Sequence, residues 1–205
     1  MTRVFLLRHA PTAWNGIHRF QGRSDIPLAS TSAAELRRQR IPSPWIELKW
    51  YSSPLIRCVQ TAQLLGKHVV TGSEHLIEMN WGEFEGLKLE QINEQINHLG
   101  LHPDRGLDLT PPGGESPRMV RERLEAWLHR LPEESEAVVA VTHKGVIRAA
   151  LSLATGWDMM SAFTRTVDWH LPHCFEWQDG SLRLFRLNCR WRDTSLLPRS
   201  DIGGT

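Results

Sequence analysis

The chain has 205 residues, and its formal net charge is +1 with neutral histidines. This near balance argues against a general nucleic-acid or membrane-surface binder, which would carry a basic excess or a clustered basic face. The first apolar run is too short for a signal peptide, and no apolar run approaches a membrane span in length. The length predicts one domain over residues 1–191, followed by a polar C-terminal tail over 192–205.

The cysteines and histidines do not form a recognisable disulfide or metal pattern. Cys58, Cys174 and Cys189 lack the close pairing of a disulfide framework and the spacing of a metal site. We therefore expect three reduced, mostly buried thiols in a cytoplasmic protein. His170 and His173 have no matching third ligand, so we expect no bound metal.

The first half of the chain alternates between strand-like and helix-like segments. A β-rich apolar run at Val4–Leu7 predicts a strand, and Ala33–Arg40 predicts a helix with its charges on one side. Leu48–Ser52 is weakly strand-like. Ser53-Pro54 is typical of an N-cap followed by proline in the first turn, and the helix that it opens should end at Gly66.

The second half continues the alternation. Val69-Val70 favours a short strand, and the amphipathic segment 87–100 favours a helix. Segment 116–131 opens with Ser-Pro and predicts a long helix. The run 137–142 is the clearest buried strand, and segment 145–156 should follow it as a helix that stops at glycine.

The end of the chain adds an antiparallel element. Segment 174–187 predicts a hairpin because Asp179-Gly180 separates two alternating runs. Strands that alternate with helices imply a largely parallel sheet covered on both faces. The expected fold is a three-layer α/β/α sandwich with a mostly parallel central sheet and an antiparallel edge strand.

Two histidines and two arginines are expected at one edge of this sheet. The first strand ends at Arg8-His9, and the clearest buried strand ends at His143. Arg57 lies one helical turn beyond the end of a third strand. Sites in open α/β sheets form beyond the carboxyl ends of the strands, so these four side chains should meet there.

Such a group suits phosphoryl chemistry. Arginine forks bind phosphate oxygens in a bidentate way and stay charged at any working pH. Helix N-termini at the same edge add N–H donors and positive potential. A neutral imidazole beside them can attack phosphorus and carry the group covalently, and a nearby carboxyl group can protonate the leaving oxygen.

Six blocks of the sequence resemble the histidine phosphatase superfamily, in its phosphoglycerate-mutase-like branch. The blocks keep the family's order and spacing from about Val4 to Arg148. They read "LLRHAPTAWN", "RFQGRSDIPL", "SSPLIRCVQTA", "IEMNWGEFEG", "PPGGES" and "VVAVTHKGVIR". An Arg-His pair alone is a weak signal, but six blocks in register are a specific one.

The resemblance implies a role for each matching residue at the sheet edge. His9 would be the nucleophile that becomes phosphohistidine. Arg8, Arg57 and His143 would hold the phosphoryl oxygens, and Asn15 would also reach the phosphate pocket.

The resemblance also implies a proton donor and a neighbouring loop. Glu78 matches the carboxylate that protonates the leaving oxygen and later takes a proton from water. Its competitors are Glu83 and Glu85. Gln21 and Gly22 would lie on the loop beside the phosphate.

The sequence departs from the family pattern in three places, one of which is the segment 29–35, where the usual glycine is missing. Ala10 and Lys144 each follow one of the two histidines that match the family's catalytic histidines, where the family usually has glycine. Alanine there disfavours a positive φ, and the lysine fits either a charged rim or solvent. Trp14, Phe20 and Trp81 fit either a substrate cleft or core packing.

The expected function is a metal-independent phosphatase without a cofactor, acting on a small phosphomonoester through phosphohistidine. Neither nucleic acid nor membrane is an expected partner, and the oligomeric state stays open, with a homodimer as one alternative. The Pro- and Gly-containing segment 99–116 should contribute a lid or wall. Because His9 must be neutral to attack, activity should fall in acid, an effect that Arg8 and Arg57 offset by holding down the pKa of its imidazole.

Two other functions stay open. A cofactor-dependent phosphoglycerate mutase shares the pocket, but family mutases look longer between the positions of Glu78 and His143, and a more open pocket favours hydrolysis. A catalytically inactive phospholigand-binding regulatory module would have lost a catalytic side chain, and all of them are present in this sequence.

Overall fold

The structure is a computed structural model, and it describes residues 1–98 and 106–197. Its strands are β1 (Thr2–Arg8), β2 (Lys49–Ser52), β3 (Thr71–Gly72), β4 (Ala137–Thr142), β5 (His173–Gln178) and β6 (Ser181–Arg186). Its α-helices are α1 (Ala13–Gly16), α2 (Ser30–Arg38), α3 (Ser43–Glu47), α4 (Ile56–Leu64), α5 (Leu89–His98), α6 (Pro117–Leu128) and α7 (Lys144–Thr155). Short 3₁₀ helices are η1 (Glu74–Leu76), η2 (Gly82–Phe84), η3 (Gly106–Asp108) and η4 (Thr194–Leu196).

The strands form one sheet in the order β3-β2-β4-β1-β5-β6. The first four strands in that order are parallel, whereas β5 and β6 are antiparallel to their neighbours. The predicted fold class is therefore confirmed, with an antiparallel pair at one edge of the sheet. The pairing of Arg8 with Thr142, and of Ser52 with Val141, brings the carboxyl ends of three strands level.

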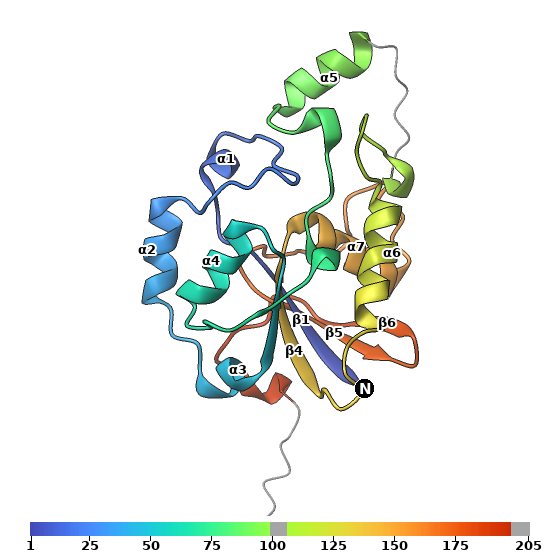
Figure 1. Ribbon diagram of the computed structural model, residues 1–205. Helices are drawn as coiled ribbons and strands as arrows, with labels where there is room; N and C mark the ends of the chain where they lie inside the picture. Colours follow the sequence, from blue (N-terminus) through green and yellow to red (C-terminus); the bar gives the residue numbers. More distant parts are fainter. Residues whose placement is uncertain (99–105, 198–205) are drawn as a thin grey trace, which may run out of the picture.

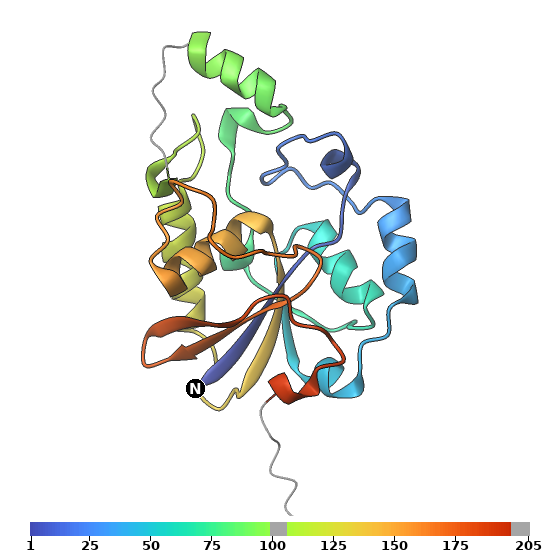
Figure 2. The same ribbon diagram turned by 180° about the vertical axis from the view of Figure 1, so that it is seen from behind.

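The two faces of the sheet are buried under different helices. Along β1, Val4 and Leu6 join a core cluster with α6 and α7, while Phe5 and Leu7 join a second cluster with α2, α3 and α4. This alternation follows from the period of two in a strand, and it explains why the apolar run is continuous. Figures 1 and 2 show these two layers on opposite sides of the sheet, with α1 and α5 beyond the carboxyl ends of the strands.

Several element boundaries agree with the sequence. Ser116 caps α6 by accepting a hydrogen bond from the Met119 N–H at 3.2 Å, with proline in the first turn. Asp179 and Gly180 join β5 to β6 with φ values of 50° and 71°. Both residues of a type I′ hairpin turn need a positive φ, which Asp-Gly supplies.

Two local predictions are wrong. The N-cap of α4 is Leu55, not Ser53, because the Ser53 hydroxyl is used by a histidine of the site described below. The short strand lies at Thr71–Gly72 instead of at Val69-Val70, because those are the residues that pair with the end of β2. Val69 itself is exposed.

The beginning of the predicted tail packs against the domain. Leu196, in η4, is buried, and its carbonyl accepts a hydrogen bond from the Arg3 guanidinium. Residues 198–205 of the predicted tail, and 99–105 of the predicted lid or wall, lie outside the described residues. Within the described helices, none combines the length and apolar character that a membrane crossing requires.

Candidate active site

A cavity of about 730 Å³ opens at the carboxyl ends of the parallel strands. It is lined by the end of β1, the loop before α2, the start of α4, the segment after η1, and the first turns of α7. Seven of the predicted site residues line this cavity: Arg8, His9, Asn15, Gln21, Gly22, Arg57 and Glu78. His143 lies behind it and is fully buried.

One ring nitrogen of His9 is hydrogen-bonded to the backbone, which leaves the other available as a nucleophile. Its Nδ1 lies 2.8 Å from the carbonyl oxygen of Ala10, which can only accept, so Nδ1 carries the proton. The lone pair is then on Nε2, the nitrogen that a nucleophile needs. Burial lowers the pKa of His9 well below its usual value, and the charges of Arg57 and Arg8 lower it further. The imidazole is therefore neutral at neutral pH.

Arg57 is a fully buried cation held by oxygen and nitrogen acceptors. Its two terminal nitrogens donate to the carbonyls of Gly22 at 2.7 Å and Ser24 at 2.8 Å, and its Nε donates to Nδ1 of His143 at 3.3 Å. A guanidinium has five N–H donors, so these three bonds leave donors for a ligand. A buried charge without a salt bridge in the described residues costs stability, which points to a binding role.

Arg8 brings a second guanidinium to the cavity. Its Nε is buried and, within the described residues, has no hydrogen-bond partner. A buried donor without an acceptor is costly, so this atom fits an anion that would accept from it. Arg8 and Arg57 thus bring two guanidinium groups to one cavity, an arrangement that suits the binding of a phosphoryl dianion.

His143 is held in place by hydrogen bonds at both ring nitrogens. Since Nδ1 accepts from Arg57, the proton is on Nε2, which donates to the Ser53 hydroxyl at 2.8 Å. Its ring centroid lies 5.2 Å from that of His9. Burial lowers the pKa of His143 well below the usual value, and Arg57 adds to the effect. Direct contact between His143 and a phosphoryl oxygen stays a prediction.

Glu78 lies against the N-terminus of α7. Its carboxylate accepts from the Met79 N–H at 2.8 Å and from the Gly145 N–H at 3.3 Å. A Cβ atom on Gly145 would lie 2.3 Å from this carboxylate, so only glycine permits the approach. Burial raises the pKa of Glu78 despite both hydrogen bonds and Arg57, which lower it. A carboxyl group that keeps its proton to higher pH suits a general acid.

Asn15 and Gln21 are joined through Thr12. The Asn15 side-chain oxygen accepts from the Thr12 N–H at 2.9 Å and so closes a capping box at α1. The Thr12 hydroxyl lies 3.0 Å from the Gln21 side-chain oxygen. Asn15 therefore both caps a turn and lines the cavity, with its amide N–H₂ available as a donor.

Glu85 braces the loop that holds Arg57. Its carboxylate accepts from the Arg23 N–H at 2.7 Å and from the N–H and hydroxyl of Ser24 at 2.9 and 2.8 Å. Gly22, at a φ of 52°, has no room for a Cβ, which would lie 1.9 Å from this carboxylate. Glu85 thus fixes the two carbonyls that bind Arg57, a different role from that of Glu78.

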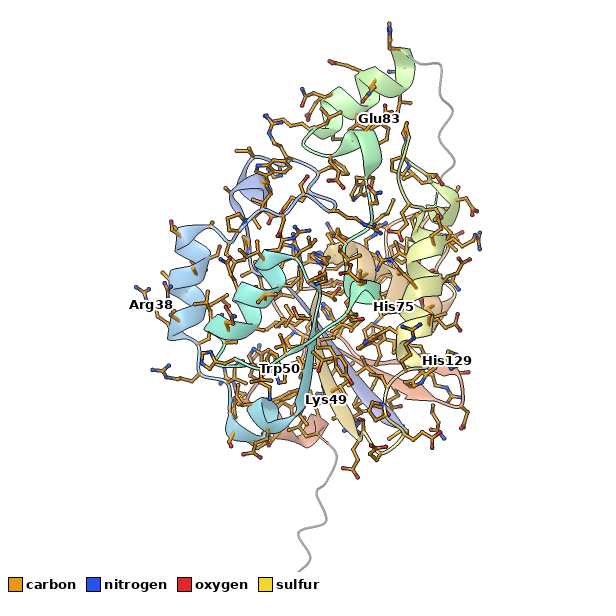
Figure 3. The ribbon with its side chains drawn as sticks, viewed as in Figure 1. Arg38, Lys49, Trp50, His75, Glu83 and His129 are labelled. Atoms are coloured by element: carbon orange, nitrogen blue, oxygen red, sulfur yellow. The ribbon has the colours of Figure 1, made fainter. Side chains whose placement is uncertain are left out.

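Glu85→Ala should lower the free energy of unfolding by about 1–3 kcal/mol, because it removes charge-assisted hydrogen bonds from the loop to the Glu85 carboxylate. It should also lower kcat/KM for phosphomonoesters, since Arg57 loses its fixed acceptors. The matched control is Glu83→Ala, which removes an exposed carboxylate two residues away (Figure 3). Urea unfolding and steady-state kinetics check both. An equal effect of the two variants would contradict the role of Glu85.

The departures from the family pattern have local explanations. Ala10 does not adopt a positive φ, and its N–H donates to the Thr61 hydroxyl at 3.0 Å, so the methyl group causes no strain. Lys144 lines the cavity. Phe20 and Trp81 also line it and pack edge to face, with ring centroids 4.6 Å apart.

Sequence reasoning missed three cations that line the cavity: Arg19, Arg148 and, as a site residue, Lys144. A signal for two of them was available, since Lys144 and Arg148 are four residues apart and therefore share a face of the expected helix. The position of Arg19 depends on a hydrogen bond to the carbonyl of Gly86, which lies far away in sequence. No local sequence pattern predicts that Arg19 would line the cavity.

Comparisons with known proteins agree with this geometry. The model of the histidine phosphatase superfamily (branch 1) matches residues 4–190. The chain is 28% identical over 177 residues to an uncharacterized phosphatase, PhoE, of Bacillus subtilis, covering 82% of this chain and 85% of that protein. It is 33% identical over 168 residues to a probable phosphoglycerate mutase, GpmB, of Yersinia enterocolitica, covering 76% of each.

Solved structures show the same relationship. TTHB049 from Thermus thermophilus is 30% identical with a TM-score of 0.68, covering 92% of this chain and 100% of that one. A putative alpha-ribazole-5'-P phosphatase from Escherichia coli shares the fold, at 21% identity and a TM-score of 0.73 over 92% of this chain and 97% of its own. With a family model matching nearly the whole chain, this protein belongs to branch 1 of the histidine phosphatase superfamily.

Proposed function

We propose that the protein is a metal-independent phosphatase that hydrolyses a small phosphomonoester through a phosphohistidine on His9. The observation that carries this proposal is the neutral His9, whose Nδ1 is bound to a carbonyl and whose Nε2 is left for attack. It lines the same cavity as two arginines and a carboxyl group of raised pKa. Relatives named as phosphatases support hydrolysis.

The first step transfers the phosphoryl group to the protein. Nε2 of His9 attacks phosphorus, and the ester P–O bond breaks as the N–P bond forms. Arg8 and Arg57 stabilise the charge on the equatorial oxygens. Glu78 in its acid form gives its proton to the leaving oxygen, so the alcohol departs neutral.

The second step releases inorganic phosphate. The carboxylate of Glu78 takes a proton from water while the water oxygen attacks phosphorus. The N–P bond breaks, and its electron pair returns to Nε2 of His9. Both residues thereby regain their starting protonation states.

The test has two parts: trapping the phosphohistidine intermediate, and measuring whether activity depends on a metal ion. Protein quenched during turnover of ³²P-labelled substrate should carry acid-labile, base-stable label, and the label should be absent from His9→Ala. Turnover should be unchanged by EDTA. Absence of any label, or loss of activity in EDTA, would overturn the proposal.

A phosphoglycerate mutase is the second candidate, because relatives named as probable mutases are up to 33% identical to this chain among those compared. It would use the same His9 and Glu78 but return the phosphoryl group to the sugar acid. Incubation with 3-phosphoglycerate and a bisphosphate primer separates the two. Faster formation of 2-phosphoglycerate than of inorganic phosphate would favour the mutase.

The pH optimum should lie on the acidic side of neutrality. Attack needs neutral His9, whose lowered pKa keeps it neutral below the usual 6.5. Proton donation needs protonated Glu78, whose raised pKa extends its acid form above the usual 4.5. Activity on an alkyl phosphate should therefore hold as pH falls from about 7 to about 6, in place of the loss in acid expected from the sequence, because burial lowers the His9 pKa in addition to Arg57 and Arg8. Activity should decline as pH rises through the Glu78 pKa. A tenfold loss between about pH 7 and 6 would contradict the lowered pKa of His9.

We place the proposed phosphatase in the cytoplasm, as expected from the sequence. Cys58, Cys174 and Cys189 are free and buried, which supports a reducing, cytoplasmic location. A small-molecule phosphomonoester is the proposed partner, and the cavity volume is that of a typical small-molecule site.

A further inference from the structure

Among the described residues, the cavity carries more positive charge than a phosphoryl group needs. Five arginine or lysine side chains line it, and the single lining carboxylate is Glu78, which has a raised pKa. The lining cations are Arg8, Arg19, Arg57, Lys144 and Arg148. A phosphomonoester dianion bound by the two arginines beside His9 would leave the others without a counter-charge.

Lys144 and Arg148 form a pair on one face of α7. They are one helical turn apart, and both line the cavity. Within the described part of the chain, neither side chain makes a hydrogen bond or a salt bridge. Burial lowers the pKa of Lys144, and so do the charges of Arg8 and Arg148. The two positive charges repel each other, which destabilises the folded protein unless an anion binds to both.

Two tryptophans hold this pair in place. The Lys144 ammonium lies 5.0 Å from the ring centroid of Trp169, and the Arg148 guanidinium lies 4.9 Å from that of Trp157. Trp157 is itself anchored, since its indole N–H donates to the Ser161 carbonyl at 3.1 Å. An aromatic face orients a cation without cancelling its charge, so the pair stays able to bind an anion.

The pair lies on the leaving-group side of the site. Glu78, which would protonate the leaving oxygen, is bound to the N–H of Gly145, the residue between the two cations on α7. The cavity lining also includes the apolar side chains of Phe20, Trp81 and Leu109, which offer no charge to an anion. A group that meets Lys144 and Arg148 would therefore belong to the departing alcohol and not to the transferred phosphate.

From this geometry we propose that Lys144 and Arg148 form a subsite for a second anionic group, a carboxylate or a second phosphate, carried by the leaving alcohol. The inference rests on the proposed phosphatase function and narrows its substrate class. It makes the preferred substrate a phosphorylated acid or a bisphosphate, with neutral phosphoalcohols disfavoured.

The test compares three substrates of equal carbon number: glycerol 1-phosphate, 3-phosphoglycerate and glycerol 1,3-bisphosphate. Release of inorganic phosphate should show a kcat/KM at least about tenfold higher for one or both of the doubly anionic substrates, as expected of charge-assisted hydrogen bonds. The better of the two identifies the anion as carboxylate or phosphate. Equal kcat/KM values for all three would overturn the inference.

Variants assign the preference to the pair. Arg148→Met and Lys144→Met should each reduce the ratio of kcat/KM between charged and neutral substrates, mainly through KM, whereas Arg148→Lys should retain part of it. The controls are Arg38→Met and Lys49→Met, which remove cations away from the cavity (Figure 3) and should leave the ratio unchanged. A ratio that survives both pair variants would also overturn the inference.

Failure of the underlying function has a different signature. If the protein forms no phosphohistidine and releases no phosphate from any of the three substrates, the proposed phosphatase function fails. If it hydrolyses all three through His9 but without preference, only the second-anion subsite fails.

Discussion

His9→Ala is expected to lower kcat/KM by about 10⁴-fold or more, because it removes the atom that forms the N–P bond. His143 cannot replace it, since both of its ring nitrogens are bound, to Arg57 and to Ser53. The measurement is steady-state hydrolysis of p-nitrophenyl phosphate together with ³²P labelling. The label should disappear along with turnover.

The control for this variant is His129→Ala, which removes an exposed histidine beyond the end of α6 (Figure 3). It should retain both turnover and label. Circular dichroism and urea unfolding should show that the His9 variant is folded, since Arg57 keeps its hydrogen bonds to Gly22, Ser24 and His143. Turnover of His9→Ala within tenfold of the unaltered protein would rule out this residue as the nucleophile.

Glu78→Gln should lower kcat for alkyl phosphates by about 10²–10³-fold, the usual worth of a general acid. An alkoxide is a poor leaving group and needs the proton, whereas p-nitrophenolate departs readily without one. The loss should therefore be much smaller for p-nitrophenyl phosphate. Glutamine keeps the size of the side chain and one of the two acceptor oxygens, so it can accept from the N–H of Met79 or of Gly145, which bind different oxygens of Glu78, but not from both.

The pH profile provides a second readout for Glu78. The decline of activity as pH rises through the Glu78 pKa should vanish in Glu78→Gln, because glutamine has no titratable proton. Glu83→Gln, at an exposed position of the same segment, should keep the decline and the rate. An equal loss for both substrates would indicate a structural effect in place of proton donation.

The central part of the fold and site was predictable because the relevant signals are local. Val4–Leu7 and Ala137–Thr142 are continuous apolar runs, as expected for strands buried on both faces. Their ends fixed the positions of His9 and His143, and the N–H of His9 continues the ladder to the Thr142 carbonyl at 2.9 Å. Strand ends in a parallel sheet meet at one edge whatever the loops do.

The features of the fold and site that the sequence did not predict depend on contacts between segments far apart in the chain. Ser53 has the sequence features of an N-cap, but its hydroxyl binds His143, 90 residues away. Glu85 and Glu78 lie in one short segment, and only the position of the loop that contains Gly22 and Ser24 distinguishes their roles. Cation–aromatic pairs such as Lys144 with Trp169 likewise have no fixed spacing in a sequence.

The burial of Arg57 has a consequence for how the protein responds to its surroundings. Its charge is held in the interior by carbonyl oxygens and an imidazole, and the nearby Arg8 keeps a buried donor without an acceptor among the described residues. Burying these two cations without a counter-charge lowers the stability of the folded protein. An oxyanion that binds between Arg8 and Arg57 would restore part of that stability. The melting temperature should consequently rise with the concentration of free orthophosphate, because orthophosphate would bind the native state and not the unfolded chain. The reaction product would then act both as an inhibitor and as a stabiliser of the same molecule.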